Sequence, residues 1–323
     1  MPDLELVFLI SLPRSGSTLL QKILAVHPDV ASKGEPWLLL PLAFMNRSEG
    51  IEAVYFHKAA AQAIRELIGN LPGGEETYRT HLRTFVLSLY RLLAGERRVF
   101  VDKDTRYYLI LDFLAEVFPT AKFVFLFRNP LDVMSSAITT YRRNRLLTHA
   151  YHVDLYDGVR LINQGRKRYA SRSIEVHYNR LTQEPQNEVP RICDFLGLDF
   201  REEMLTHYKE IDFGGTTGDP TGIYRYQQIS TDSIDRWKEV LNSRYRIRFA
   251  RQYLKAIGDA ELEPFGISLS EFEKAIPRQN LRLRGSLTDF VFRHLSDVWR
   301  VMSGPRLEEM LLNRGKKEIN IFG

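Results

Sequence analysis

The chain has 323 residues, and 45 Lys and Arg residues against 40 Asp and Glu residues give it a formal net charge of +5. Hydrophobic residues make up 44% of the sequence and charged residues 26%, which excludes a disordered or fibrous protein. This length allows about two domains, or one large α/β domain with insertions. The charge favours an anionic ligand, but it is too small for a protein that coats nucleic acid.

The single cysteine, Cys193, leaves no internal disulfide and no cysteine-based metal site, so we expect a buried thiol in a reducing compartment. The first residues of the chain include Asp3 and Glu5 but no basic residue. The apolar run at 6–10 is too short to cross a membrane and lacks the basic flank of a signal peptide. We therefore expect a cytoplasmic protein without stable membrane insertion.

Four segments have the continuous apolar character of parallel strands that are buried on both faces. They are residues 4–11, 99–101, 122–127 and 174–178. Apolar residues at helical spacing follow at 19–24, 109–118, 130–141 and 189–196. Pro130 and Asp132 suit the first turn of a helix, and Gly197 suits a helix end. This alternation predicts an α/β fold with a P-loop-like, doubly wound, mostly parallel sheet flanked by helices.

Long stretches of helical composition lie outside this alternation. Residues 38–95 predict a helical insertion that is broken at Pro41 and at 71–74. Residues 212–222 contain four glycines and one proline, and we expect a flexible loop that acts as a lid over an acceptor.

The main domain is expected to span residues 1–260, and a helical C-terminal extension is expected at 261–323. An apolar stripe at helical spacing runs along this extension and consists of Leu287, Phe290, Val291, Leu295, Val298 and Met302. We expect the helix that carries this stripe to pack on the domain rather than to bind a membrane.

A turn rich in Arg, Ser and Gly, residues 12–18, joins the first predicted strand to the first helix. Backbone N–H groups at a helix start point in one direction, and the helix dipole adds positive charge, so such a turn binds phosphate or sulfate. Gly16 allows a ligand to approach closely, Ser17 and Thr18 add hydroxyl donors, and Arg14 adds a full charge. The alternative is an ordinary strand–helix turn in which a serine caps the helix.

The turn differs from the nucleotide-hydrolysing P-loop, Gly-x-x-x-x-Gly-Lys-[Ser/Thr]. Ser17 stands where that motif has its lysine, and Ser11 stands where it has its first glycine. The loop shape is kept, but the lysine that reaches the β- and γ-phosphates of a triphosphate is missing. Triphosphate chemistry is therefore not expected.

Residues 12–20 resemble the 5′-phosphosulfate-binding loop of sulfotransferases that use 3′-phosphoadenosine 5′-phosphosulfate (PAPS). In these enzymes an arginine at a strand end and a serine eight residues later hold the 3′-phosphate of the donor. Here Arg128 follows the strand at 122–127, and Ser136 lies eight residues further along. The two side chains can meet only if the helix folds back over the strand end, as in a doubly wound sheet.

The resemblance narrows towards the tyrosylprotein sulfotransferases and their bacterial relatives. It is carried, in the order of that branch, by residues 25–35, 101–104, 118–136, 176–197 and 230–237. The residues after about 240 carry no motif of the family.

This resemblance implies that Glu35 is the general base, because it matches the catalytic glutamate of the tyrosylprotein branch. Cytosolic sulfotransferases use a histidine shortly after a strand-end lysine, whereas no histidine follows Lys103 at 104–106. Lys103 and Arg14 would stabilise the charge that builds on the leaving phosphate. The histidines that we expect to be structural are His27, His149 and His177.

The resemblance also implies which residues hold PAPS or its product, adenosine 3′,5′-bisphosphate, without a metal ion. In the phosphate-binding loop they are Arg14, Ser15, Gly16, Ser17, Thr18 and Leu19. Elsewhere in the chain they are Arg128, Ser136, Tyr178, Ser230 and Arg236. Tyr178 would contact the adenine, Ser230 the 5′ side of the donor, and Arg236 replaces a cofactor-binding lysine.

The sequence departs from the family at one position of the 3′-phosphate site. The second arginine of the family, four residues after the serine, falls on Thr140. Arg142 or Arg143 would have to replace it.

The motifs predict transfer of a sulfuryl group from PAPS to a hydroxyl by in-line displacement. One alternative is a kinase in which Thr18 and Asp102 or Asp104 hold Mg²⁺, and the missing P-loop lysine argues against it. Another is a binding protein that has lost catalysis. The joint presence of a base, a strand-end lysine and a 3′-phosphate pair argues against that reading.

The acceptor is expected to be a hydroxyl of a small natural product, a lipid or a sugar. The sequence lacks the membrane anchor and the disulfide-forming cysteines of secretory tyrosylprotein enzymes. Sulfation of tyrosine in a peptide is the alternative. The insertion at 38–95 is expected to line the acceptor pocket. We expect no nucleic-acid partner. The sequence is compatible with a homodimer.

Overall fold

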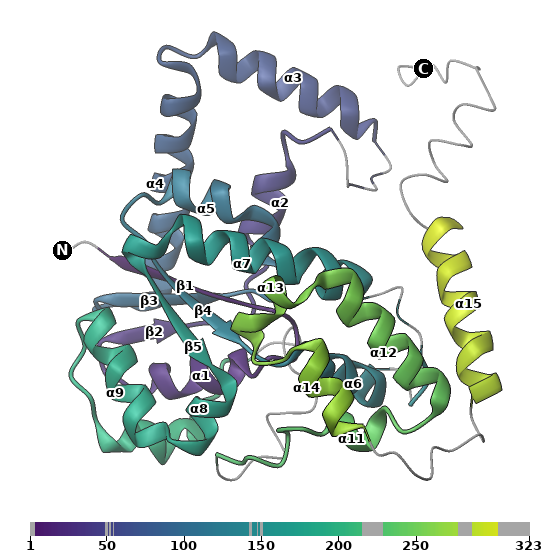
Figure 1. The fold of residues 1–323 in the computed structure, drawn as a ribbon. Coiled ribbons are helices and arrows are strands. Elements are labelled where there is room, and N and C mark those ends of the chain that lie inside the picture. The colour runs from purple at the N-terminus through teal and green to yellow at the C-terminus, as the bar shows by residue number, and fades with distance from the viewer. Residues whose placement is uncertain are drawn as a thin grey trace, which may run out of the picture.

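The computed structural model describes residues 4–48, 51, 53, 55–141, 144–146, 148, 151–214, 229–276 and 286–302. Strands in these ranges form one parallel sheet in the order β2-β3-β1-β4-β5 (Figure 1). The strands are β1 (Glu5–Ser11), β2 (Val30–Ser32), β3 (Val99–Lys103), β4 (Lys122–Phe127) and β5 (Ser173–His177). The predicted α/β fold with a parallel sheet is confirmed.

Helices connect the strands and cover both faces of the sheet (Figure 1). Up to β5 they are α1 (Ser17–Ala25), α2 (Leu39–Phe44), α3 (His57–Asn70), α4 (Gly74–Ala94), α5 (Leu111–Val117), α6 (Pro130–Tyr141) and α7 (Val159–Arg168). After β5 they are α8 (Tyr178–Gln183), α9 (Pro185–Leu196), α11 (Trp237–Val240), α12 (Arg244–Ile257), α13 (Asp259–Leu262), α14 (Leu269–Ala275) and α15 (Ser286–Met302).

The central strand β1 contributes alternate side chains to two separate hydrophobic cores. Phe8 and Ile10 lie in the larger core, which includes side chains of α4, α5, α6, α7 and α12. Val7 and Leu9 lie in the second core, with side chains of α1, α8 and α9. Because both faces of the strand are buried, its sequence is a continuous apolar run rather than an alternating one. Burial on both faces fixes the position of the loop that follows Ser11.

The predicted elements agree with the observed ones at most positions. The strand at 122–127 and the helix at 130–141 have the predicted bounds. The strand predicted at 174–178 ends at His177, and Tyr178 opens α8 instead. Strand β2 was not predicted, because its three residues are too few to form a recognisable apolar run.

The insertion between β2 and β3 is helical, as predicted, and contains α2, α3 and α4. The predicted break at 71–74 separates α3 from α4, but the break predicted at Pro41 is wrong. Pro41 is the third residue of α2, where its missing N–H removes no hydrogen bond within the helix.

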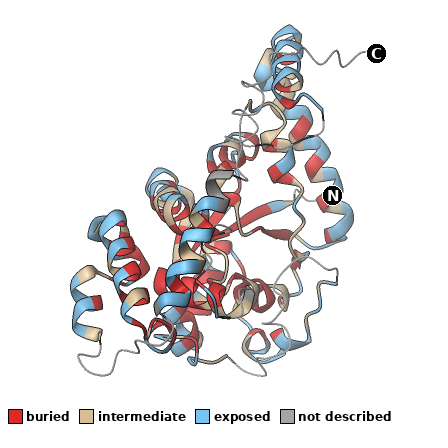
Figure 2. Ribbon diagram, turned by 90° about the vertical axis from the view of Figure 1, so that its right-hand side faces the viewer, coloured by how far each residue is buried: buried red, intermediate tan, exposed pale blue. Residues whose placement is uncertain are grey.

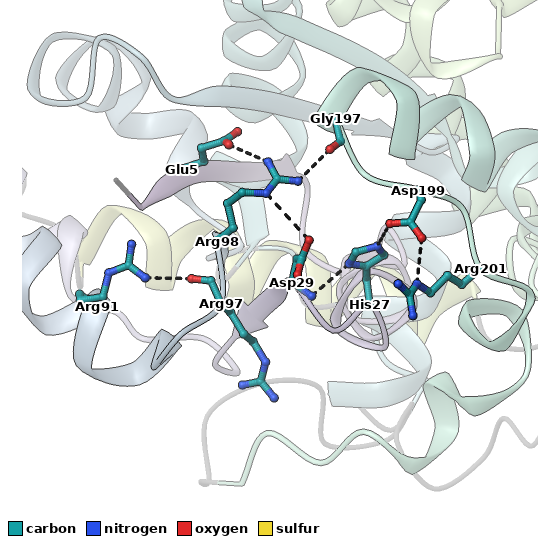
Figure 3. Close-up of polar contacts among 9 residues, drawn as sticks. All are labelled: Glu5, His27, Asp29, Arg91, Arg97, Arg98, Gly197, Asp199 and Arg201. Carbon is teal, nitrogen blue, oxygen red and sulfur yellow. Dashed lines mark hydrogen bonds and ion pairs between the residues drawn. The ribbon is translucent and has the colours of Figure 1, made fainter. Parts of the chain in front are cut away.

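The amino ends of the strands are held together by an arginine network (Figure 3). The Arg98 guanidinium donates to Oε1 of Glu5 at 2.7 Å and to the carbonyl oxygen of Gly197 at 2.8 Å. Nearby, Nδ1 of His27 accepts from the backbone N–H of Asp29 at 3.1 Å, so its Nε2 atom donates to Asp199 at 2.9 Å. His27 therefore has the structural role that we expected, and it lies at the opposite edge of the sheet from the phosphate-binding loop.

Helix α15 lies against α12 at the margin of the molecule (Figure 1). The helix packs on the domain through α12, but the stripe residues Leu287 and Leu295 are 76% and 55% exposed. Within the described ranges, no helix is both long enough and apolar enough to cross a membrane.

Candidate functional site

The candidate site lies at the carboxyl edge of the sheet, where the ends of neighbouring strands meet. The loop after β1 carries Arg14, β3 ends with Lys103, and Arg128 follows β4. Glu35 lies three residues after β2, and Tyr178 directly follows β5. The carboxyl edge of an open parallel sheet, near its central strand, is the usual position of a ligand-binding crevice.

The phosphate-binding loop turns sharply between β1 and α1. Arg14 has φ 68° and Gly16 has φ 91°, both in the left-handed region. A Cβ atom at position 16 would also lie 2.5 Å from ring atoms of Tyr178, so the tyrosine packs directly against the glycine. Ser17 begins α1 and is buried, Thr18 is half-buried, and Leu19 packs against the second core. The chain therefore needs glycine at position 16 for both its backbone angle and its space.

Arg14 and Arg128 connect this loop to α6. Nε of Arg14 donates to Oγ of Ser136 at 3.2 Å, across 122 residues of sequence. Arg128 donates to the carbonyl oxygen of Arg14 at 2.8 Å, and its guanidinium carbon lies 4.2 Å from the centre of the Tyr178 ring. The structure thus brings Arg14, Arg128, Ser136 and Tyr178 together, with Ser136 bonded to Arg14 rather than to Arg128.

A distal segment at 229–237 is fastened to the same site. Arg128 donates to the carbonyl oxygen of Ser233 at 2.7 Å, and the Asp132 carboxylate accepts from the backbone N–H groups of Asp235 at 3.1 Å and Trp237 at 3.0 Å. Sequence reasoning placed Asp132 only in the first turn of a helix and missed this anchoring role. Within this segment, the hydroxyl of Ser230 accepts from the backbone N–H of Asp232 at 3.0 Å, and Arg236 is exposed.

An ion pair occupies the centre of the carboxyl edge. Nζ of Lys103 lies 2.7 Å from Oε1 of Glu35, and the side chains are 1% and 9% exposed. The same Nζ lies 3.5 Å from Oγ1 of Thr18 in the first turn of α1. The predicted base, the predicted charge-stabilising lysine and the phosphate-binding loop are therefore direct neighbours.

Gln21 holds the segment that presents Glu35, and sequence reasoning missed it. Its buried Nε2 group donates to Oγ of Ser32 at 2.8 Å and to the carbonyl oxygen of Gly34 at 2.9 Å. Ser32 also donates to the carbonyl oxygen of Val101. In the sequence, Gln21 looks like an ordinary residue of α1, so only the packing of α1 beside β2 reveals the role of Gln21.

Two further carboxyl groups are buried around Lys103. Asp102 accepts hydrogen bonds from the hydroxyls of Tyr90 at 2.6 Å and Tyr107 at 2.8 Å, and burial raises its pKa to about 6. Asp104 accepts from the backbone N–H of Arg106 at 3.2 Å, and burial raises its pKa to about 7, with the negative charges of Glu35 and Asp102 acting in the same direction. Burial therefore favours the neutral form of both carboxyl groups beside the lysine.

Two buried donors in the site have no hydrogen-bond partner among the described residues. They are the hydroxyl of Ser15 and the Nε group of Arg128. Buried polar groups are almost always paired in folded proteins, so these donors fit a bound anion. Together with the turn at Gly16, they suit the phosphate and sulfate groups of a nucleotide donor.

Three predicted elements of the site lie wholly or partly outside the described residues. Arg142 and Arg143 are outside, so the replacement of the second 3′-phosphate arginine stays a prediction. His149 and residues 215–222 of the expected lid are outside as well. His177 is described. It stacks on Phe127 with ring centres 5.6 Å apart, and burial lowers its pKa, as suits a neutral packing residue.

The family model described as "Sulfotransferase family" matches residues 7–202. Nodulation protein NoeE of Sinorhizobium fredii is 29% identical over 263 residues, and protein-tyrosine sulfotransferase 2 of Gallus gallus is 22% identical over 242 residues. In each case the alignment covers 72% of this chain and 60% of the relative, so the chain spans less than two thirds of these curated relatives.

Two solved structures share the fold. The sulfotransferase domain from the curacin biosynthetic pathway is 25% identical with a TM-score of 0.51, and the match covers 74% of this chain and 92% of that domain. The sulfotransferase domain from the Synechococcus PCC 7002 olefin synthase is 27% identical with a TM-score of 0.50, covering 73% and 87%.

Proposed function

The chain belongs to the sulfotransferase family, and on this basis we propose that it transfers the sulfuryl group of PAPS to a hydroxyl group of an acceptor. The observation that carries the proposal is the buried Lys103–Glu35 pair, whose Nζ and Oε1 atoms are 2.7 Å apart, beside the phosphate-binding loop. A base and a cation at one point beside an anion-binding loop are what sulfuryl transfer to a hydroxyl requires.

The donor would be held by groups that the site already presents. The backbone of the loop around Gly16, the unpartnered hydroxyl of Ser15 and the guanidinium of Arg14 would bind the phosphosulfate end. Arg128, Ser136 and the distal segment with Ser230 and Arg236 would bind the remaining phosphate. PAPS supplies an activated sulfuryl group whose leaving group is a phosphate.

Glu35 would take the proton of the acceptor hydroxyl. A carboxylate can do this when it is shielded from water and held in place, and Glu35 is 9% exposed and fixed through the Gln21-bound segment before it. Lys103 reaches both the Glu35 carboxylate and the Thr18 hydroxyl, so its charge lies between the base and the loop. We assign Lys103 and Arg14 to the stabilisation of charge on the leaving phosphate.

We propose a small-molecule hydroxyl as the acceptor, with tyrosine in a peptide as the second candidate. The two structurally similar domains come from a biosynthetic pathway and an olefin synthase, which supports the first candidate. The similarity to a protein-tyrosine sulfotransferase supports the second. The insertion with α2, α3 and α4 is the proposed source of the acceptor pocket.

A thermal-shift titration tests the donor first. Adenosine 3′,5′-bisphosphate at 100 times its dissociation constant should add about 2.7 kcal/mol of stability without Mg²⁺. A transfer assay with PAPS then tests small hydroxyl compounds beside tyrosine peptides. Stabilisation by Mg·ATP alone would overturn the proposal in favour of a kinase. Binding of the bisphosphate without turnover on any hydroxyl would favour the binding protein.

A further inference from the structure

Helix α15 is bound to the body of the protein through its polar side. Asp289 and Ser296 are 5% and 1% exposed, whereas the apolar stripe on the other side of the helix is open. The exposed fractions are 76% for Leu287, 45% for Phe290, 46% for Val291, 55% for Leu295 and 54% for Val298. This is the reverse of an ordinary surface helix, which buries its apolar side.

A buried ion pair fixes this orientation. Arg246 of α12 donates to Oδ2 of Asp289 at 2.8 Å and to Oδ1 at 3.0 Å, and it also donates to the carbonyl oxygen of Val240 at 2.9 Å. Rotating α15 to bury the stripe would separate two buried charges, which is strongly unfavourable. The outward direction of the stripe is therefore built into the contact between α12 and α15.

The stripe forms a continuous strip on a protruding helix. Its residues between 287 and 298 follow the three- and four-residue spacing of a helix side, so they line about 17 Å of helix. The helix lies at the margin of the molecule in Figure 1 and faces the viewer in Figure 2, where its outer surface is coloured mostly as exposed. Exposed apolar strips of this kind mark binding surfaces for a partner or a membrane.

The helix on which α15 packs is basic. Helix α12 contains five basic residues and no acidic residue, and Arg244 and Arg248 are exposed without an ion pair to any described residue. In the sequence they come directly before Tyr245 and Phe249, which touch α15: the Tyr245 ring meets the Phe290 ring at 5.9 Å, and the Arg293 guanidinium lies 5.1 Å from the Phe249 ring. By sequence alone, residues 277–323 contain nine Lys and Arg against five Asp and Glu.

We propose that the apolar stripe of α15, together with the exposed Arg244 and Arg248 of the neighbouring helix α12, docks the protein on an anionic lipid surface. An apolar helix side bordered by cations matches the interface of a bilayer, where apolar side chains enter the acyl boundary and arginines meet anionic headgroups. A second copy of the chain fits less well, because a symmetric dimer through the stripe would bring the same basic helices together. The docking is peripheral and independent of sulfuryl transfer.

Vesicle flotation with the full chain tests the proposal. We expect the protein to float with phosphatidylcholine vesicles that contain about 30% phosphatidylserine and to stay behind with pure phosphatidylcholine, with binding lost at high salt. The Val291→Ser, Leu295→Ser double variant should lose at least about tenfold in vesicle affinity. The Arg244→Gln, Arg248→Gln double variant should lose the preference for anionic vesicles over pure phosphatidylcholine vesicles.

A matched control separates docking through the stripe from non-specific hydrophobic binding to vesicles. Leu92 on α4 is 79% exposed, so Leu92→Ser removes a similar apolar group from an unrelated helix and should leave flotation unchanged. Thermal unfolding of each variant checks that the fold is kept, and light scattering gives its mass. The proposal is overturned if the wild type does not float, or if Leu92→Ser loses as much vesicle affinity as the stripe variant. It is also overturned if the wild type is a dimer that dissociates in the stripe variant while flotation persists.

Discussion

The Nζ atom of Lys103 lies 2.7 Å from Oε1 of Glu35, and both side chains are almost fully withdrawn from water. The two residues are 68 positions apart in the sequence and meet because β2 and β3 are adjacent parallel strands. The pair joins the candidate base to the candidate charge-stabilising group.

Glu35→Gln should lower kcat by a factor on the order of 10² or more, because an amide cannot take the proton of an acceptor hydroxyl. The affinity for adenosine 3′,5′-bisphosphate, measured by calorimetry, should stay within about twofold of the wild type, since the proposed donor contacts are made by other residues. Glu96→Gln, on an exposed glutamate before β3, is the control and should change neither value. Unchanged turnover in Glu35→Gln would remove Glu35 as the base.

Arg128→Ala should weaken binding of adenosine 3′,5′-bisphosphate far more than binding of adenosine 5′-phosphate, because only the first carries a 3′-phosphate. It should also lower stability by roughly 2–4 kcal/mol, since the carbonyl oxygens of Arg14 and Ser233 lose their donor. Arg65→Ala is a matched control, because Arg65 also donates to a backbone carbonyl but lies on α3. Equal weakening of both nucleotides would mean that Arg128 holds the loop without contacting the 3′-phosphate.

Gln21→Ala should lower kcat by roughly tenfold to a hundredfold with little change in donor affinity, because the segment that presents Glu35 loses its side-chain donor. Steady-state kinetics at saturating donor measure the effect. Gln62→Ala, on the exposed side of α3, should leave kcat unchanged. A fall in donor affinity without a fall in kcat would contradict a role in positioning the base.

Asp104→Asn should stabilise the folded protein at pH 8 and have little effect near pH 3. Burial raises the pKa of Asp104 from 3.8 to about 7, so the folded state binds the proton more tightly than the unfolded state. Stability from this group is complete below pH 3.8 and is lost as pH rises towards 7. The loss is on the order of 4 kcal/mol, which the neutral amide avoids.

Thermal unfolding of Asp104→Asn and the wild type across this pH range measures the difference. Asp157→Asn, on an exposed aspartate, should show no such divergence. Parallel curves for Asp104→Asn and the wild type would show that the Asp104 carboxyl is not held in its neutral form.

The sequence alone was sufficient for the elements that carry strong local signals. Strands buried on both faces need continuous apolar runs, so β1 and β4 could be predicted, while the three residues of β2 are too few to carry that signal. The turn at residues 12–18 was predictable for a similar reason. A glycine with φ 91° directly before a helix, flanked by Arg, Ser and Thr, is a local feature of the chain.

Contacts between residues that are distant in the sequence were decided only by the tertiary structure. Ser136 was expected beside Arg128, but its hydroxyl accepts a hydrogen bond from Arg14, 122 residues away in the sequence. The roles of Gln21 and Asp132 depend on which loops lie beside α1 and α6. The outward stripe of α15 follows from the buried Arg246–Asp289 pair, which outweighs the apolar pattern of the helix. Local patterns determine where strands, turns and helices form, whereas strand order and buried charge pairs determine which side chains meet.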